Sequence, residues 1–248
     1  METGRKHALL AVLVLGSVAA AFFVKPISQP PGYHDFADQR TLWGMPHFMD
    51  VVSNLPFLVV GGYGLYNALS RTDLYYPVPE ARWPWTLLAL AILLTGFGSA
   101  YYHRAPSDAT LFWDRLPMSI GFSALLGIMI LERVNPRLGR WGWIPIVLAG
   151  VGSLLYWRWQ GDLRFYYLLQ VWAVLLVGVI LALFRAPCTQ TGALVEGIAS
   201  YAGSKLLELL DAPIFSLTHV ASGHTLKHLA AAAGSWFLFM HLLRRRPV

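Results

Sequence analysis

Eight long apolar segments divide this chain, and they restrict it to one kind of fold. Each segment is close to the ~20 residues that a helix needs to cross a bilayer, and short polar loops separate them. The 194–211 segment fits least well, because it carries Glu196, Lys205 and Glu208. We therefore expect an all-α, polytopic membrane protein built as a helical bundle. The segments are residues 8–24, 47–68, 85–103, 114–132, 141–157, 163–185, 194–211 and 219–243.

The composition agrees with this class and excludes several others. Of the 248 residues, 56% are hydrophobic and 13% are charged, against about a quarter charged in soluble domains. The single cysteine, Cys188, excludes an internal disulfide and a cysteine-rich metal site. The net charge of +6 comes from basic residues scattered through short loops and a terminal RRRPV. That distribution is typical of membrane topology, so we expect no nucleic-acid partner.

The N-terminal segment has two interpretations. METGRKH followed by ALLAVLVLGSVAAAFFV has the basic head and apolar run of a secretory signal peptide, and residues 19–21 are a candidate cleavage site. The apolar run is long for a signal peptide, which favours a retained signal-anchor helix over residues 1–24. Residues 25–46 then form an outer loop, and residues 244–248 form a basic cytoplasmic tail.

The basic residues also predict an orientation. With the N-terminus inside, eleven Lys and Arg lie in inner segments and six in outer ones, leaving aside Lys205 and Lys227 within apolar segments. Since cytoplasmic loops carry the excess of Lys and Arg, both termini are predicted to be cytoplasmic. The short loops and the plain basic N-terminus favour a bacterial inner-membrane protein. The sequence gives no sign of the oligomeric state.

Two short stretches place polar residues inside apolar segments. GFGSAYYHRAPSDATLFWDRLPM holds Ser99 and His103 four residues apart, with Asp114 eleven residues later, and SGHTLKHLAAAAG repeats the spacing with His224 and His228. Four helical residues turn ~400°, so each pair shares one helix face. Two histidines on one face plus a third from elsewhere provide the three nitrogen ligands of a catalytic zinc. The predicted topology brings both stretches to the outer face of the membrane.

Each of these residues also has a structural interpretation. An intramembrane histidine can join helices by hydrogen bonds, and Ser99 can serve small-residue helix packing. Asp114 can act as an N-cap, since Pro117 falls in the following first turn. Ionisable groups in membrane segments are nevertheless costly and usually functional. The spacing alone leaves the metal site and the structural interpretation open.

Three other charged residues receive structural predictions. Lys227 is expected to extend its amine to the outer interface. Lys205 and Glu208, three residues apart, are expected to neutralise each other inside the bundle.

The motifs GFGSAYYH, DRLPM and HTLKH resemble the signatures of alkaline ceramidases. These belong to a wider group of seven-helix membrane hydrolases that includes progestin/adiponectin-type receptors and GPI-remodelling proteins. The resemblance extends from about residue 35 to residue 243. It implies a seven-helix catalytic domain at residues 47–243, to which the first helix is an addition.

The resemblance also implies a site and a reaction. His103, His224 and His228 would bind zinc, whose fourth position would hold an activated water. Asp114 would orient and deprotonate that water, and Ser99 would hydrogen-bond the developing oxyanion. The implied substrate is a membrane lipid like ceramide, whose amide bond is cleaved to a fatty acid and a sphingoid base.

The chain departs from the family pattern at Arg115, where the family has glutamate in DELPM, and at Lys227, where it often has tryptophan. GYHDFADQRTLWGMPHFMDVVSNLPF resembles the family's calcium-binding segment and keeps three candidate ligands, Asp35, Asp38 and Asp50. His47 takes the place of a carboxylate ligand there, and calcium prefers several oxygen ligands, which argues against retained calcium. Ser53 and Asn54 of the same segment are expected to join helices by hydrogen bonds.

Two other functions stay open at this stage. One zinc site can attack an ester as well as an amide, so a phospholipase-like acyl-ester hydrolase is an alternative. The other alternative is a non-catalytic receptor or structural protein, in which zinc only links helices to one another. Structural zinc usually has four protein ligands, so direct contact of Asp114 with the metal would favour that second alternative.

Overall fold

The computed structural model describes residues 3–248, and its regular secondary structure is all helical. Among these residues there is no β-strand beyond two isolated bridges. A 3₁₀ turn at Pro79–Ala81 precedes α4, and a π-helical turn at Ile130–Val134 follows α5. The predicted all-α class is thus confirmed. The helices are α1 Thr3–Ala21, α2 Phe48–Val52, α3 Leu55–Ser70, α4 Arg82–Arg104, α5 Asp108–Met129, α6 Pro136–Gln160, α7 Arg164–Leu183, α8 Thr191–Leu209, α9 Asp211–Thr218 and α10 Gly223–Arg244.

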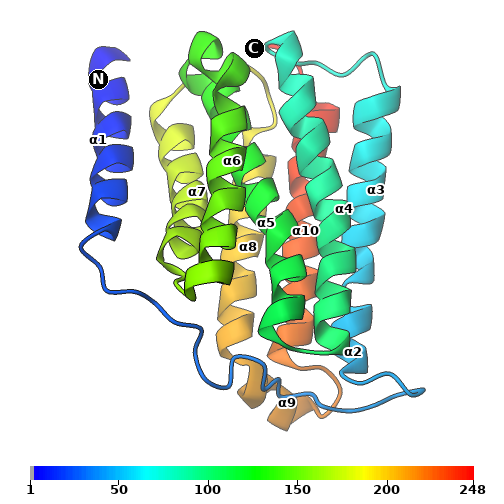
Figure 1. Ribbon diagram of the computed structural model, residues 1–248. Helices are drawn as coiled ribbons and strands as arrows, with labels where there is room; N and C mark the ends of the chain where they lie inside the picture. Colours follow the sequence, from blue (N-terminus) through cyan, green and yellow to red (C-terminus); the bar gives the residue numbers. More distant parts are fainter. Residues whose placement is uncertain (1–2) are drawn as a thin grey trace.

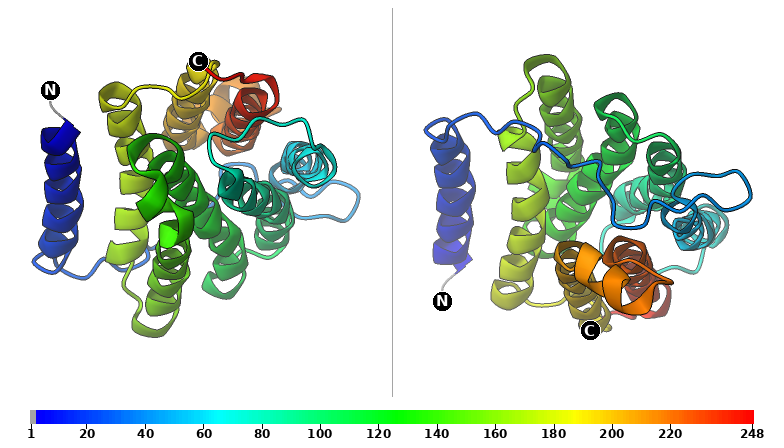
Figure 2. Two further views of the ribbon diagram at one scale, coloured as in Figure 1. Left: turned by 90° about the horizontal axis from the view of Figure 1, so that it is seen from above. Right: turned by 90° about the horizontal axis from the view of Figure 1, so that it is seen from below.

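The long helices run side by side as a bundle (Figure 1). α4 packs between α3 and α5, α10 packs against α8, and α1 stands to one side against α7. Both ends of the chain lie at the upper end of the bundle in Figure 1, whereas α4 ends and α10 begins at the lower end. The segment between α1 and α2 crosses this lower end together with α9 (Figure 2, right).

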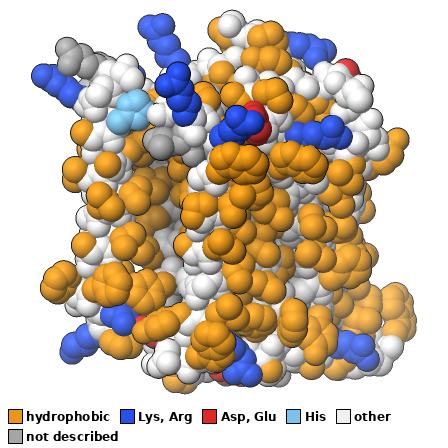
Figure 3. All heavy atoms as spheres, turned by 45° about the horizontal axis from the view of Figure 1, so that its top comes forward, with side chains coloured by type: hydrophobic (Ala, Val, Ile, Leu, Met, Phe, Trp, Pro, Cys, Tyr) orange, Lys and Arg blue, Asp and Glu red, His pale blue; other side chains and the backbone are white. Residues whose placement is uncertain are grey.

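Five helical segments among the described residues are long and apolar enough to cross a membrane. They are Thr3–Ala21, Phe48–Ser70, Pro79–Arg104, Asp108–Val134 and Arg164–Leu183. Three helices that coincide with predicted spans are not among them: α8, which was expected to fit least well, and also α6 and α10. Figure 3 shows a broad band of hydrophobic side chains between two rims where Lys and Arg side chains lie. The membrane class is supported, while the seven-helix core stays a prediction.

The start of α5 differs from the prediction. The helix begins at Asp108, and the side chain of Ser107 caps it by accepting a hydrogen bond from the Thr110 amide at 3.2 Å. Serine competes well for this position because its oxygen accepts from the free amides of the first turn. Asp114 therefore lies within the helix, and its interpretation as an N-cap is wrong.

The last predicted segment also begins later than residue 219. Residues 211–218 form the separate short helix α9, which ends at His219 in a left-handed conformation with φ 52°. Ser222 then caps α10 by accepting from the Thr225 amide at 3.0 Å. Apolar composition alone cannot detect such a break, because both helices are apolar.

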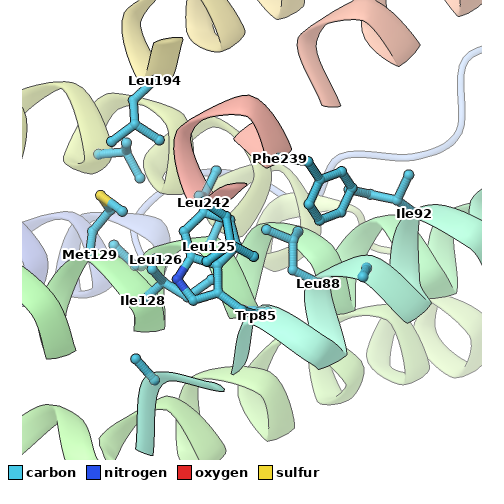
Figure 4. Packing of buried hydrophobic residues seen from close by; sticks show 14 of the residues in the cluster. Trp85, Leu88, Ile92, Leu125, Leu126, Ile128, Met129, Leu194, Phe239 and Leu242 are labelled. Atoms are coloured by element: carbon cyan, nitrogen blue, oxygen red, sulfur yellow. The ribbon is translucent and has the colours of Figure 1, made fainter. Parts of the chain in front are cut away.

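The middle of the bundle is filled by large apolar side chains from several helices (Figure 4). Trp85 and Leu88 of α4, Leu125 of α5, and Phe239 and Leu242 of α10 are buried there. This cluster joins side chains of α4, α5 and α10, the three helices that carry the predicted site residues, while the backbone of α10 packs directly on α8 and α3.

The predicted C-terminal tail is attached to the bundle. Arg245 is 1% exposed, and its guanidinium donates to Glu132 at 2.8 Å and to the Tyr75 carbonyl at 2.8 Å. The Trp85 indole donates to the other oxygen of Glu132 at 2.9 Å. A buried charge is tolerated when it is paired and hydrogen-bonded in this way.

Candidate metal centre

Three buried histidines meet at the lower end of the bundle. His103 comes from the last turn of α4, and His224 and His228 come from the first two turns of α10. The ring centroids form a nearly equilateral triangle, with separations of 4.8, 4.9 and 4.9 Å. One nitrogen of each ring lies within 4.8 Å of the others, a geometry that no other group of three His, Cys, Asp or Glu in residues 3–248 has.

The spacing of these nitrogens fits a tetrahedral metal ion. Nε2 of His103 and Nε2 of His224 are 3.2 Å apart. Two nitrogens that each lie 2.0–2.1 Å from a tetrahedral zinc are separated by about 3.3 Å. The three residues predicted as ligands are therefore brought together in an arrangement that can hold a metal ion.

Ser53 sets the orientation of the His228 ring. Its hydroxyl lies 3.0 Å from the carbonyl oxygen of Asp50, to which it donates, and 2.7 Å from Nδ1 of His228. Because the hydroxyl proton is used on the carbonyl, Nδ1 must carry a proton and donate it to the serine oxygen. This leaves Nε2 of His228 with a free electron pair, as a metal ligand requires. The helix-joining role predicted for Ser53 is confirmed, and it acts on a site residue.

Ser99 and Asp114 form a second part of the site. The hydroxyl of Ser99, on α4, donates a hydrogen bond to the carboxylate of Asp114, on α5. The two helices approach closely because Gly98 lies against the carbonyl of Trp113, where a β-carbon would clash. The glycine before the serine thus has a definite role in bringing Ser99 to Asp114.

A cavity of about 190 Å³ connects these two parts of the site, with Ser99, Asp114 and His228 in its wall. A second cavity of about 130 Å³ is lined almost entirely by apolar side chains. The two share wall residues, so they adjoin. The shared residues are Phe57, Thr95, Met118, Tyr201 and Ala231.

Lys227 points into the site instead of toward the interface, so its predicted orientation is wrong. Its amine lies 3.0 Å from Glu208 and 2.9 Å from Nε2 of His224. The predicted pairing of Lys205 with Glu208 is confirmed, with a separation of 2.9 Å. Glu208 therefore forms ion pairs with both lysines. Because Lys227 and Glu208 are both partly buried, their ion pair stabilises the inward orientation of the Lys227 side chain more than hydration at the interface would stabilise the outward one.

The segment between α1 and α2 covers the histidines from below. The Phe36 ring is buried, and its centroid is 4.6 Å from those of His103 and His224. Asp211 fastens this cover by accepting from the Ala37 amide at 3.0 Å and from the His224 amide at 2.8 Å. Phe36 and Asp211 were not predicted as site residues. The sequence signal for Phe36 is its position inside the segment that resembles a metal-binding region, and Asp211 has no such signal.

The three aspartates proposed for calcium are not brought together. Asp35 is exposed, and Asp38 is paired with Arg40 at 2.6 Å. Asp50 accepts from the Thr225 hydroxyl at 2.7 Å. Burial raises the pKa of Asp38, but the hydrogen bonds and charge of Arg40 outweigh it and lower that pKa overall. Asp38 and Asp50 thus have separate partners, and among the described residues the three carboxylates form no metal-ligand group.

The fold and the site define an all-helical, membrane-type protein with a three-histidine centre at one end of its bundle. One of these histidines, His228, lines the central cavity together with the hydroxyl of Ser99 and the carboxylate of Asp114. No protein-family model matches the chain, and no curated protein matches it. The functional assignment therefore depends on the geometry of this centre.

Proposed function

We propose that this protein is a zinc-dependent membrane hydrolase that cleaves the amide bond of ceramide-like lipids, similar to alkaline ceramidases. The observation that carries the proposal is the cluster of three buried histidines, one of which, His228, shares a cavity wall with the Ser99–Asp114 pair. A seven-helix membrane domain at residues 47–243 is part of the proposal.

Each residue has a role that its position supports. His103, His224 and His228 would hold zinc, which supplies a Lewis acid and an activated water when bound. Asp114 accepts the proton of the attacking water and passes it to the leaving amine. Ser99, hydrogen-bonded to Asp114 in the resting protein, turns its hydroxyl to the developing oxyanion.

The two adjoining cavities suit a lipid substrate. The polar cavity has space beside His228 for the amide group, and the apolar cavity takes part of an acyl chain. The exposed hydrophobic band of the bundle is a surface that the acyl chains of the bilayer can contact (Figure 3). The excess of Lys and Arg in the segments on the side of the two chain ends supports cytoplasmic chain ends and a site at the outer face of the membrane. A bacterial inner membrane is part of the proposal.

Among the alternatives, an acyl-ester hydrolase uses the same residues and differs only in the bond that is attacked. A non-catalytic protein with a structural zinc has less support. Asp114 does not belong to the ligand group of the three histidines and instead accepts a hydrogen bond from Ser99. This arrangement favours an open fourth position on the metal over a closed set of four protein ligands.

The zinc content of two purified histidine variants tests the proposed site. We expect His228→Ala to lose both bound zinc and hydrolysis. We expect the matched control His241→Ala to keep both, since His241 is equally buried but binds the Gln190 carbonyl near the other end of α10. Full zinc content in His228→Ala would contradict the assignment.

A further inference from the structure

Arg115 is the most unusual charged residue of the central cavity. Its side chain lies in the wall of the cavity that also holds Asp114 and His228, and the residue is 2% exposed. Three aromatic rings surround the guanidinium carbon at 4.7–5.1 Å, those of Tyr33, Trp157 and Tyr166. These rings stack on the guanidinium and hold it in one place.

Arg115 has no carboxylate partner among residues 3–248. Its hydrogen-bond partners are neutral: the amide oxygen of Gln29 accepts from it at 2.9 Å, and the hydroxyl of Tyr33 accepts a second hydrogen bond. By contrast, the buried Arg245 is paired with Glu132, and Lys227 of the same cavity is paired with Glu208. Buried charges are normally paired, so an arginine left without an acid at a cavity wall indicates that the partner comes with a ligand.

The charges of the side chains in the cavity wall also indicate an anionic ligand. Its wall holds three cationic side chains, Arg115, Lys205 and Lys227, and two acidic ones, Asp114 and Glu208. Glu208 is engaged by both lysines, and Asp114 by Ser99. The cavity wall therefore carries one more cationic than acidic side chain, and Arg115 is the one of the three cations that forms no ion pair with a described residue.

We propose that Arg115 binds an anionic group of the lipid, so that the substrate is an anionic acyl lipid. This inference rests on the proposed function and narrows its substrate class. A guanidinium binds phosphate, sulfate or carboxylate through paired N–H donors. Because Arg115 and His228 line one small cavity, the anionic group must lie close to the bond that is cleaved.

Equilibrium binding of matched lipids tests the proposal without turnover. The detergent-purified protein is treated with a chelator and titrated with fluorescent ceramide, ceramide phosphate and a free fatty acid. We expect ceramide phosphate to bind more tightly than ceramide. Arg115→Gln should weaken ceramide phosphate binding roughly 10- to 100-fold, the effect of losing one charged hydrogen-bonding partner, and leave ceramide binding unchanged.

Arg164→Gln is the matched control, because Arg164 is also shielded from solvent but is paired with Asp162 at 2.8 Å outside the cavity. It should not change the preference. A purely structural role of Arg115 predicts equal weakening for both ceramides, and that result would overturn the proposal. If Arg115→Gln weakened the binding of the fatty acid and of neither ceramide, that result would also overturn the proposal, because it would assign Arg115 to the carboxylate of the product.

A second variant keeps the test decisive if Arg115→Gln does not fold. Arg115→Lys keeps the charge and loses the stacked, two-pronged geometry, so the preference for ceramide phosphate should fall several-fold without disappearing. An unchanged preference would contradict the proposal. If ceramide phosphate binds through Arg115 but metal-loaded protein hydrolyses no lipid, the anion site stands and the hydrolase proposal fails.

Discussion

Ser53→Ala should weaken metal binding without touching a ligand. Ser53 accepts the Nδ1 proton of His228 and is 6% exposed, so water cannot easily replace its hydroxyl. An unsatisfied buried donor costs about 1–3 kcal/mol. The metal-free protein can avoid this cost by moving the proton to Nε2, but the metal-bound form needs Nε2 free. The cost therefore falls on the metal-bound state, and zinc affinity should drop about 10- to 100-fold.

Competition of the purified protein with a chromophoric zinc chelator measures this affinity. The matched control is Ser119→Ala, since Ser119 is equally buried but its hydroxyl has no hydrogen-bond partner in the described residues. The control should keep the affinity of the unmodified protein. An unchanged zinc affinity in Ser53→Ala would refute the assignment of the His228 tautomer and of Nε2 as the ligand atom.

Three further substitutions separate the parts of the site. Ser99→Ala should lower kcat by about 10²–10³-fold and leave zinc affinity unchanged; full activity would exclude its role at the oxyanion. In Gly98→Ala the new β-carbon meets the Trp113 carbonyl, so this variant should lose about 1–3 kcal/mol of stability and some activity. The control Gly152→Ala has open space around the new β-carbon and should keep both. A thermal melt and an activity assay measure the two effects. Arg245→Met should cost about 3–5 kcal/mol by leaving Glu132 unpaired, with zinc affinity unchanged in the chelator competition.

Hydropathy was sufficient to find the long helices, because each predicted apolar segment overlaps one of them, but it did not separate α2 from α3 or detect α9. It was less reliable at their ends. Ser107 and Ser222 decide where α5 and α10 begin, and both act through a side-chain hydrogen bond to an amide three residues later. Such a cap is a local polar contact, which an average over an apolar segment does not detect. Asp114 was misplaced for this reason.

The ligands were predictable because helical spacing is a local property of the sequence. His224 and His228 share a face whatever surrounds them. The residues that support these ligands were not predictable, because they come from distant parts of the chain: Ser53 contacts His228 across 175 positions of sequence. The direction of Lys227 likewise depends on Glu208 of a neighbouring helix, and Phe36 reaches the histidines from a loop without regular periodicity.

The most direct test of the central claim is fatty-acid release by detergent-purified, zinc-loaded protein from a panel of ceramides and phospholipids. Each lipid is assayed with and without a chelator, and beside His228→Ala. We expect release from ceramide-type amides that stops with the chelator and is absent from the variant. Release from phospholipids alone would keep the metal site and overturn the amide substrate, and equal release by His228→Ala would contradict the three-histidine centre as the catalytic site.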